Sequence, residues 1–197
     1  MALQDVLSLT QPKKKIGLSE ERVKAQIPSF TKWVSFWREY PDIFVDMITP
    51  PSSTFKLYFY QRIFLRVAIR YKYCYATFTR AFSKSFLSVL LLMIRCILYP
   101  GAKLFIASGG KEQAANIAKE KIEEIFELLP AIKNEVNFKR SSFGKDYVRL
   151  EFKSGSRMDI VAVRESTRGG RRHGGLIEEV NKIALIYPFQ LSLGCYY

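Results

Sequence analysis

At 197 residues the chain is long enough for one domain with a hydrophobic core, and its apolar fraction of 48% is typical of globular proteins. Lys and Arg outnumber Asp and Glu by 31 to 18, which gives a net charge of +13. This excess favours a polyanionic partner such as nucleic acid; the alternative is a charge that serves solubility alone. One histidine and three widely spaced cysteines exclude a zinc site, and the longest apolar run, from Phe86, is too short to span a bilayer.

The first part of the chain is predicted to form an arm outside the core. Ser19 is a capping signal for one amphipathic helix, and Pro50-Pro51 marks a linker. We therefore expect three parts: a helical arm with its linker over residues 1–54, a domain over residues 55–180, and an apolar tail over residues 181–197.

The domain begins with alternating helix and strand patterns. A helical pattern with apolar residues such as Phe64 and Val67 leads into the β-rich run YCYATFT from Tyr73, which predicts a buried strand. A wholly apolar helix follows and ends at Pro100-Gly101. KLFIAS then predicts a second buried strand, and a long amphipathic helix runs up to Pro130.

The second half of the domain is predicted to form mainly strands. YVRLEF and RMDIVAVR, joined by KSGS, predict a hairpin, and GGLIEEV predicts a further apolar strand that ends in two carboxylates. Strands that alternate with helices indicate an α/β fold with a mainly parallel sheet covered by helices on both faces.

The stretch between the first strand and the apolar helix has the plan of a phosphate-binding loop. Set against GxxxxGK[ST], residues 78–85 match at Lys84 and Ser85, whereas Phe78 and Ser83 occupy the glycine positions. In such a loop backbone N–H groups at a helix N-terminus hold phosphate oxygens, the lysine adds charge, and the hydroxyl binds Mg²⁺. The alternative is a strand-to-helix turn whose lysine faces water.

A second feature belongs to the same chemistry. Glu178 and Glu179 follow directly on the last apolar strand, where an acidic pair can hold Mg²⁺ and polarise water. An acidic pair in this place is otherwise the solvated start of a helix. The two features together favour a nucleotide site over a chance match.

The segment TRAFSKS resembles the arginine-containing phosphate loop of the large terminase subunits of tailed bacteriophages, commonly written [ST]RQxGK[ST]. The positions that match are Thr79, Arg80, Lys84 and Ser85. Phe82 occupies the variable position, Ala81 replaces the usual Gln, and Ser83 replaces the Gly.

Other segments agree with that family in order and spacing, from about Leu57 to Val180. Gln61 stands on the helix before the loop, where the family has a Gln that contacts adenine. Arg168-Gly169 fit the family's pattern before the acidic strand, and GGLIEE is similar to its Walker B strand.

The resemblance implies an ATPase of the P-loop, RecA-like class that drives double-stranded DNA into a procapsid, with ATP and Mg²⁺ as cofactors. It places Lys84 on the β- and γ-phosphates, Ser85 and Glu178 on the metal, Glu179 on the attacking water, and Arg80 on the γ-phosphate charge. The nucleotide-binding positions of the loop and the helix before it are Gln61, Thr79, Arg80, Ala81, Phe82, Ser83, Lys84 and Ser85.

The resemblance also implies partners and a location. It implies the small terminase subunit, the portal protein and a homo-oligomeric ring, in the host cytoplasm and transiently at the procapsid portal. The family's nuclease domain has no counterpart in this sequence, and neither has the rest of the ATPase sheet. We therefore expect the chain to be the front portion of a terminase, whose hydrolysis is impaired by truncation.

Two departures and two alternatives accompany this prediction. Ser83 adds a Cβ where Gly usually stands, at a strain of about 1 kcal/mol if its φ is positive, and Glu178 is one methylene longer than the usual Asp. The first alternative is a fragment of a superfamily 2-like helicase or translocase. The second is a basic, non-catalytic DNA-binding protein in which SKS is an accident.

Overall fold

The structure is a computed structural model that describes residues 20–79, 82–108, 111–144, 147–162 and 171–177. They fall into two compact units, the first ending at Ser35 and the second beginning at Phe36. The described residues of the first unit all belong to helix α2 (Glu20–Glu39), whose last turn lies in the second unit. None of the helices in the described part of the chain is long and apolar enough to cross a lipid bilayer.

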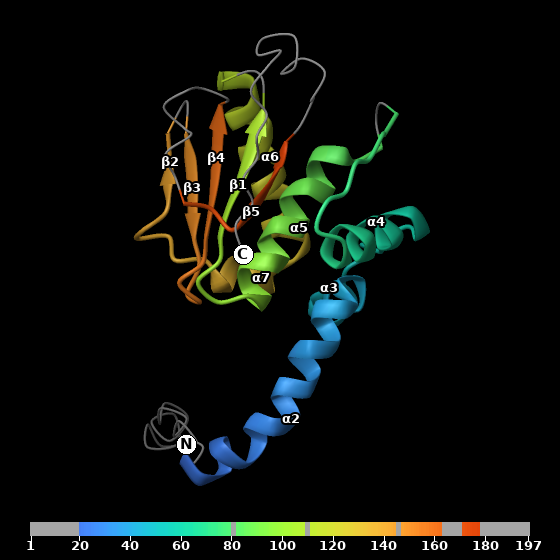
Figure 1. Cartoon of the computed structure of the whole chain (residues 1–197), viewed down its shortest axis with the longest axis vertical. Coiled ribbons are helices and arrows are strands. Elements are labelled where there is room, and N and C mark those ends of the chain that lie inside the picture. Colours follow the sequence, from blue (N-terminus) through green and yellow to red (C-terminus); the bar gives the residue numbers. More distant parts are fainter. Residues whose placement is uncertain (1–19, 80–81, 109–110, 145–146, 163–170, 178–197) are drawn as a thin grey trace, which may run out of the picture. The chain divides into compact units, whose positions relative to one another are not determined.

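The second unit is a mixed α/β structure (Figure 1). Its helices are α3 (Pro41–Ile48), α4 (Phe59–Arg70), α5 (Lys84–Leu98), α6 (Lys111–Leu128) and α7 (Pro130–Glu135). Its strands are β1 (Lys103–Ser108), β2 (Ser142–Phe143), β3 (Val148–Glu151), β4 (Arg157–Ala162) and β5 (Gly174–Ile177). The predicted α/β class is thereby confirmed.

The five strands form one sheet in the order β2-β3-β4-β1-β5. β1 pairs in parallel with β4 and with β5, whereas β3 pairs antiparallel with β4 and with β2. The prediction of a mainly parallel sheet is therefore corrected: the sheet is mixed. The antiparallel part comes from the predicted hairpin, whose turn places Gly155 at φ 77°, a conformation that glycine adopts without steric cost.

One face of the sheet is covered by helices. Leu104 and Ile106 of β1 and Met158 and Ile160 of β4 are buried, and they belong to the same core as the almost fully buried α5. α6 packs against α5 and against β4, so both helices share this face. The other face carries polar side chains in the described residues, so the helical cover that we expected on both faces is found on one.

The prediction of a buried strand at Tyr73–Thr79 is wrong. The segment is extended but belongs to no strand, and the side chains of Tyr73 and Tyr75 are 70% and 78% exposed. β-Forming residue types favour a pleated, half-buried surface, but a strand also needs a neighbour for its backbone N–H and C=O groups. Among the described residues no strand pairs with this segment.

Candidate functional site

The turn before α5 has an unusual backbone conformation. Ser83 lies at φ 51°, ψ 27°, and of the described residues it is the one non-glycine with positive φ. This left-handed conformation costs a non-glycine residue about 1–2 kcal/mol. Lys84 and Ser85 follow as the first residues of the helix, where the backbone N–H groups have no acceptor within the helix. The turn can therefore present several N–H donors and a lysine to an anion.

Of the other residues predicted to form the loop, the structure describes Thr79 and Phe82. Thr79 is exposed at the end of the extended segment. The ring of Phe82 lies 4.1 Å from that of Tyr60 and 6.2 Å from that of Phe78, and these contacts tie the loop to α4. Arg80 and Ala81 lie outside the described residues.

The start of α5 lies at the same end of the sheet as the carboxyl ends of β1 and β5 (Figure 1). A short turn joins Leu98, the last residue of α5, to Lys103, the first residue of β1, so the helix runs antiparallel to the strand. The two elements are similar in length, about 22 Å and about 20 Å. Glu178 and Glu179 follow directly on Ile177 at the end of β5, but both lie outside the described residues.

Gln61 is 4% exposed and already holds its own helix in place. Its side-chain Oε1 accepts a hydrogen bond from the Tyr58 backbone N–H at 2.9 Å, and its Nε2 donates to the Tyr60 hydroxyl at 3.4 Å. Gln61 thus caps the start of α4 from the third helical position, as the Gln of a capping box does. Sequence reasoning missed this role, although the third position of a helix is where a Gln signals it.

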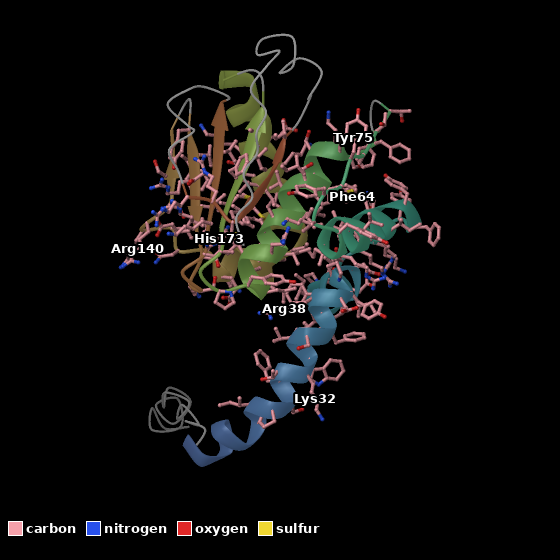
Figure 2. The ribbon with its side chains drawn as sticks, viewed as in Figure 1. Lys32, Arg38, Phe64, Tyr75, Arg140 and His173 are labelled. Carbon is pink, nitrogen blue, oxygen red and sulfur yellow. The ribbon has the colours of Figure 1, made fainter. Side chains whose placement is uncertain are left out.

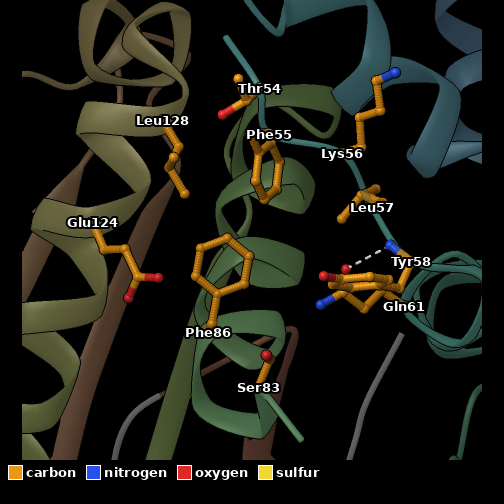
Figure 3. A pocket seen from close by; sticks show the side chains of 10 residues that line it. All are labelled: Thr54, Phe55, Lys56, Leu57, Tyr58, Gln61, Ser83, Phe86, Glu124 and Leu128. Carbon is orange, nitrogen blue, oxygen red and sulfur yellow. Dashed lines mark hydrogen bonds between the residues drawn. The ribbon is translucent and has the colours of Figure 1, made fainter.

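A pocket of about 370 Å³ brings Gln61 and Ser83 together (Figure 3). Its walls come from the segment before α4 and from α4, α5 and α6. The lining residues are Thr54, Phe55, Lys56, Leu57, Tyr58, Gln61, Ser83, Phe86, Glu124 and Leu128. The rings of Phe55 and Phe86 lie 5.9 Å apart, so the pocket combines aromatic walls with a few polar groups, as small-molecule sites do.

α4 is fixed to α3 by a buried carboxylate. Arg66 forms two hydrogen bonds of 2.8 Å with Asp42, through Nε and Nη2, and Arg62 reaches the same carboxylate at 3.4 Å. Burial would raise the pKa of Asp42, but the hydrogen bonds and charge of Arg66, aided by Arg62, outweigh it and lower that pKa. The contacts of Asp42 with Arg66 and Arg62 therefore hold α4, and with it Gln61, against α3.

The described residues contain no group of three or more His, Cys, Asp or Glu side chains that could hold a metal ion. Ser85, predicted to bind Mg²⁺, is half-buried in the first turn of α5. Its predicted partner Glu178 lies outside the described residues. Of the cysteines, Cys96 is buried in the core, and burial raises the pKa of its thiol to about 12, so it stays protonated.

No family model matches this chain, and no curated protein matches it in a sequence comparison. The resemblance to terminases therefore stays a prediction from the motifs and their spacing.

Proposed function

We propose that the chain binds ATP with Mg²⁺ at the start of α5, as the ATPase portion of a terminase-type motor that moves double-stranded DNA into a procapsid. The observation that carries the proposal is the left-handed backbone of Ser83 directly before Lys84 and Ser85. Phosphate loops use a glycine at this position because the turn needs a positive φ angle, which glycine adopts without steric cost. A serine that adopts the same angles supports the reading of SKS as a phosphate loop.

The residues of the loop then have defined tasks. The N–H groups at the start of α5 and the ammonium group of Lys84 bind phosphate oxygens, helped by the positive end of the helix dipole. Ser85 and Glu178 hold Mg²⁺, which neutralises charge on the phosphates when bound. Glu179 orients the attacking water, and Arg80 stabilises the charge that develops on the γ-phosphate.

The pocket beside Ser83 is suited to the base of the nucleotide. Phe55 and Phe86 supply aromatic surface, and Gln61 retains one N–H of its Nε2 group beyond the bond to Tyr60. Because Oε1 of Gln61 is already bound to the backbone, we expect Gln61 to meet a base as a donor.

Nucleotide binding to the full chain tests the proposal. A fluorescent ATP analogue with Mg²⁺ should bind wild type, and Lys84→Ala should weaken its binding by about 10- to 100-fold, the equivalent of one charge-assisted hydrogen bond. Lys133→Ala on α7 is the matched control, because Lys133 is exposed and lies outside the pocket. Equal binding by wild type and Lys84→Ala would refute the nucleotide site.

One observation favours a second candidate, a basic DNA-binding protein without turnover. Tyr73–Thr79 pairs with no strand among the described residues, so the loop does not follow a core strand as phosphate loops normally do. Under this reading DNA binding persists while ATP binding is absent. The two readings share a prediction of non-specific DNA affinity that falls steeply with salt.

A further inference from the structure

The face of the sheet opposite α5 and α6 carries two rows that contain charged side chains, beside a further row that includes Ala107 and Ile177. Residues paired in register point to the same face, so Glu151, Arg157 and Lys103 form one row across β3, β4 and β1. The second row contains Arg149, Asp159, Phe105 and Gly175. In Figure 2, His173 lies by the strands in the middle of the sheet, where its backbone N–H bonds to the Lys103 carbonyl at 2.8 Å.

Asp159 is the centre of this face and is only 2% exposed. Its Oδ1 accepts hydrogen bonds of 2.9 Å from the Tyr147 hydroxyl and from Nε of Arg149. Its Oδ2 lies 3.8 Å from Arg172 and 3.9 Å from Arg157. One carboxylate thus orients three guanidinium groups over the sheet.

The positive charge on this face exceeds the negative charge. Of the described residues on this face, four are cations (Lys103, Arg149, Arg157 and Arg172) and two are carboxylates (Glu151 and Asp159), a surplus of two, in a chain with a net charge of +13. Arg157 is the most weakly held guanidinium: its contact with Asp159 is 3.9 Å, and its buried Nε has no hydrogen-bond partner. The Arg157 side chain is nevertheless 32% exposed, so the outer nitrogens of its guanidinium group can reach an anion in solution.

The surface is kept flat at β5 by Gly175. A Cβ at this position would lie 2.6 Å from the backbone oxygen of Phe105 and would overlap its ring. The Phe105 ring can therefore lie across the glycine, and the Arg172 guanidinium sits 5.2 Å from the centre of that ring. Because Arg172 covers the ring, we expect contacts to phosphates and not to stacked bases.

We propose that this face of the sheet binds the phosphate backbone of double-stranded DNA, with Arg157 and Lys103 as the principal contacts. The inference rests on the DNA partner in the proposed function but does not depend on nucleotide binding. Among the described residues this face carries more guanidinium and ammonium groups than carboxylates, and such groups bind phosphates without reading sequence.

The test is anisotropy of a labelled DNA duplex of arbitrary sequence, titrated with the full chain without nucleotide. Arg157→Gln and Lys103→Gln should each weaken binding by about three- to tenfold, and each should lower the slope of log affinity against log salt by about one. Lys133→Gln, which removes the same charge from α7, should change the affinity less than twofold relative to wild type, by about the general effect of net charge. A thermal melt of each variant checks that a loss of binding is not a loss of folded structure.

Four outcomes would overturn the proposal. The first is wild-type affinity in both face variants, and the second is an equal loss in Lys133→Gln. The third is displacement of the duplex by polyglutamate at lower concentration than by unlabelled duplex, because the face would then bind an acidic polypeptide. A single-stranded competitor that binds more tightly than the duplex would likewise refute the duplex as occupant. Because the titration is made without nucleotide, failure here is distinct from failure of the ATP site.

Discussion

β1 and the segment Tyr73–Thr79 have similar composition but very different surroundings. β1 has a strand on each side, β4 and β5, and its residues Leu104 and Ile106 are buried against helices. Tyr73–Thr79 is equally rich in β-forming residues, yet within the described part of the chain no backbone hydrogen bond involves it, and its tyrosines are exposed. The difference shows that neighbours, and not composition, decide which apolar segment of this chain becomes a strand.

The largest expected contrast between the two segments is in amide hydrogen exchange. Amides of β1 should exchange only through near-global unfolding, at a free energy close to that of the domain, commonly about 5–15 kcal/mol. Amides of Tyr73–Thr79 should exchange at nearly the rate of an unstructured peptide because they lack acceptors. Exchange followed by mass spectrometry on the full chain measures both, and strong protection of Tyr73–Thr79 would show that it has a partner strand in solution.

Truncation of one side chain in each segment should differ almost as clearly. Ile106→Ala removes a buried side chain of β1 and should lower the free energy of unfolding by about 2–5 kcal/mol. Tyr75→Ala removes an exposed ring and should change it by less than about 0.5 kcal/mol. Figure 2 shows Tyr75 on the extended segment, away from the strands. Urea unfolding of both variants measures these changes, and a similar loss of unfolding free energy in both would mean that the Tyr75 ring is packed against other residues.

α4, the helix before Tyr73–Thr79, packs against both α3 and α5, and Asp42 provides a buried charged contact on the α3 side. Asp42→Asn should lower the free energy of unfolding at neutral pH by about 1–3 kcal/mol, because two arginines lose a buried partner. The folded pKa of Asp42 lies below its ordinary value, so its contribution is present above the unfolded pKa and is lost as the pH falls through the folded pKa.

The pH profile separates this effect from simple loss of packing. The difference between wild type and Asp42→Asn should be complete above about pH 5 and should shrink only below about pH 4, as the pH falls through the lowered folded pKa of Asp42. Asp46→Asn is the matched control, since Asp46 pairs with Arg62 at the surface and should contribute less than about 1 kcal/mol. A difference between wild type and Asp42→Asn that does not change with pH would contradict the assignment.

The sequence predicts those features of the fold that depend on nearby residues. The helix before Pro130, the hairpin at Gly155 and the strand at Gly174 are all found, because caps, turns and hydrophobic period are local signals. The strand at Tyr73 is not found, because pairing depends on which other strands reach that edge.

In the candidate site, too, the features that depend on nearby residues are predicted and those that depend on distant residues are not. The motif predicts that Lys84 and Ser85 begin a helix, and in the structure they are the first two residues of α5. The buried Asp42 and the arginines around Asp159 could not be predicted, since their partners lie many residues away and no spacing rule connects them. Gln61 is predicted to contact a base, and the structure shows that it also caps α4. A Gln at the third position of a helix is a local signal for such a cap.

The smallest effect is expected at the other end of the extended segment, at the turn into α5. Ser83→Gly removes a left-handed strain of about 1–2 kcal/mol and adds about 0.5–1 kcal/mol of unfolded-state entropy, so the domain should gain up to about 1 kcal/mol. Ser85→Gly is the matched control, because Ser85 is helical and the change should cost about 0.5 kcal/mol or more. Thermal unfolding compares the two. If Ser83→Gly destabilises as much as Ser85→Gly, the backbone at Ser83 is not left-handed, and the main support for the phosphate loop is lost.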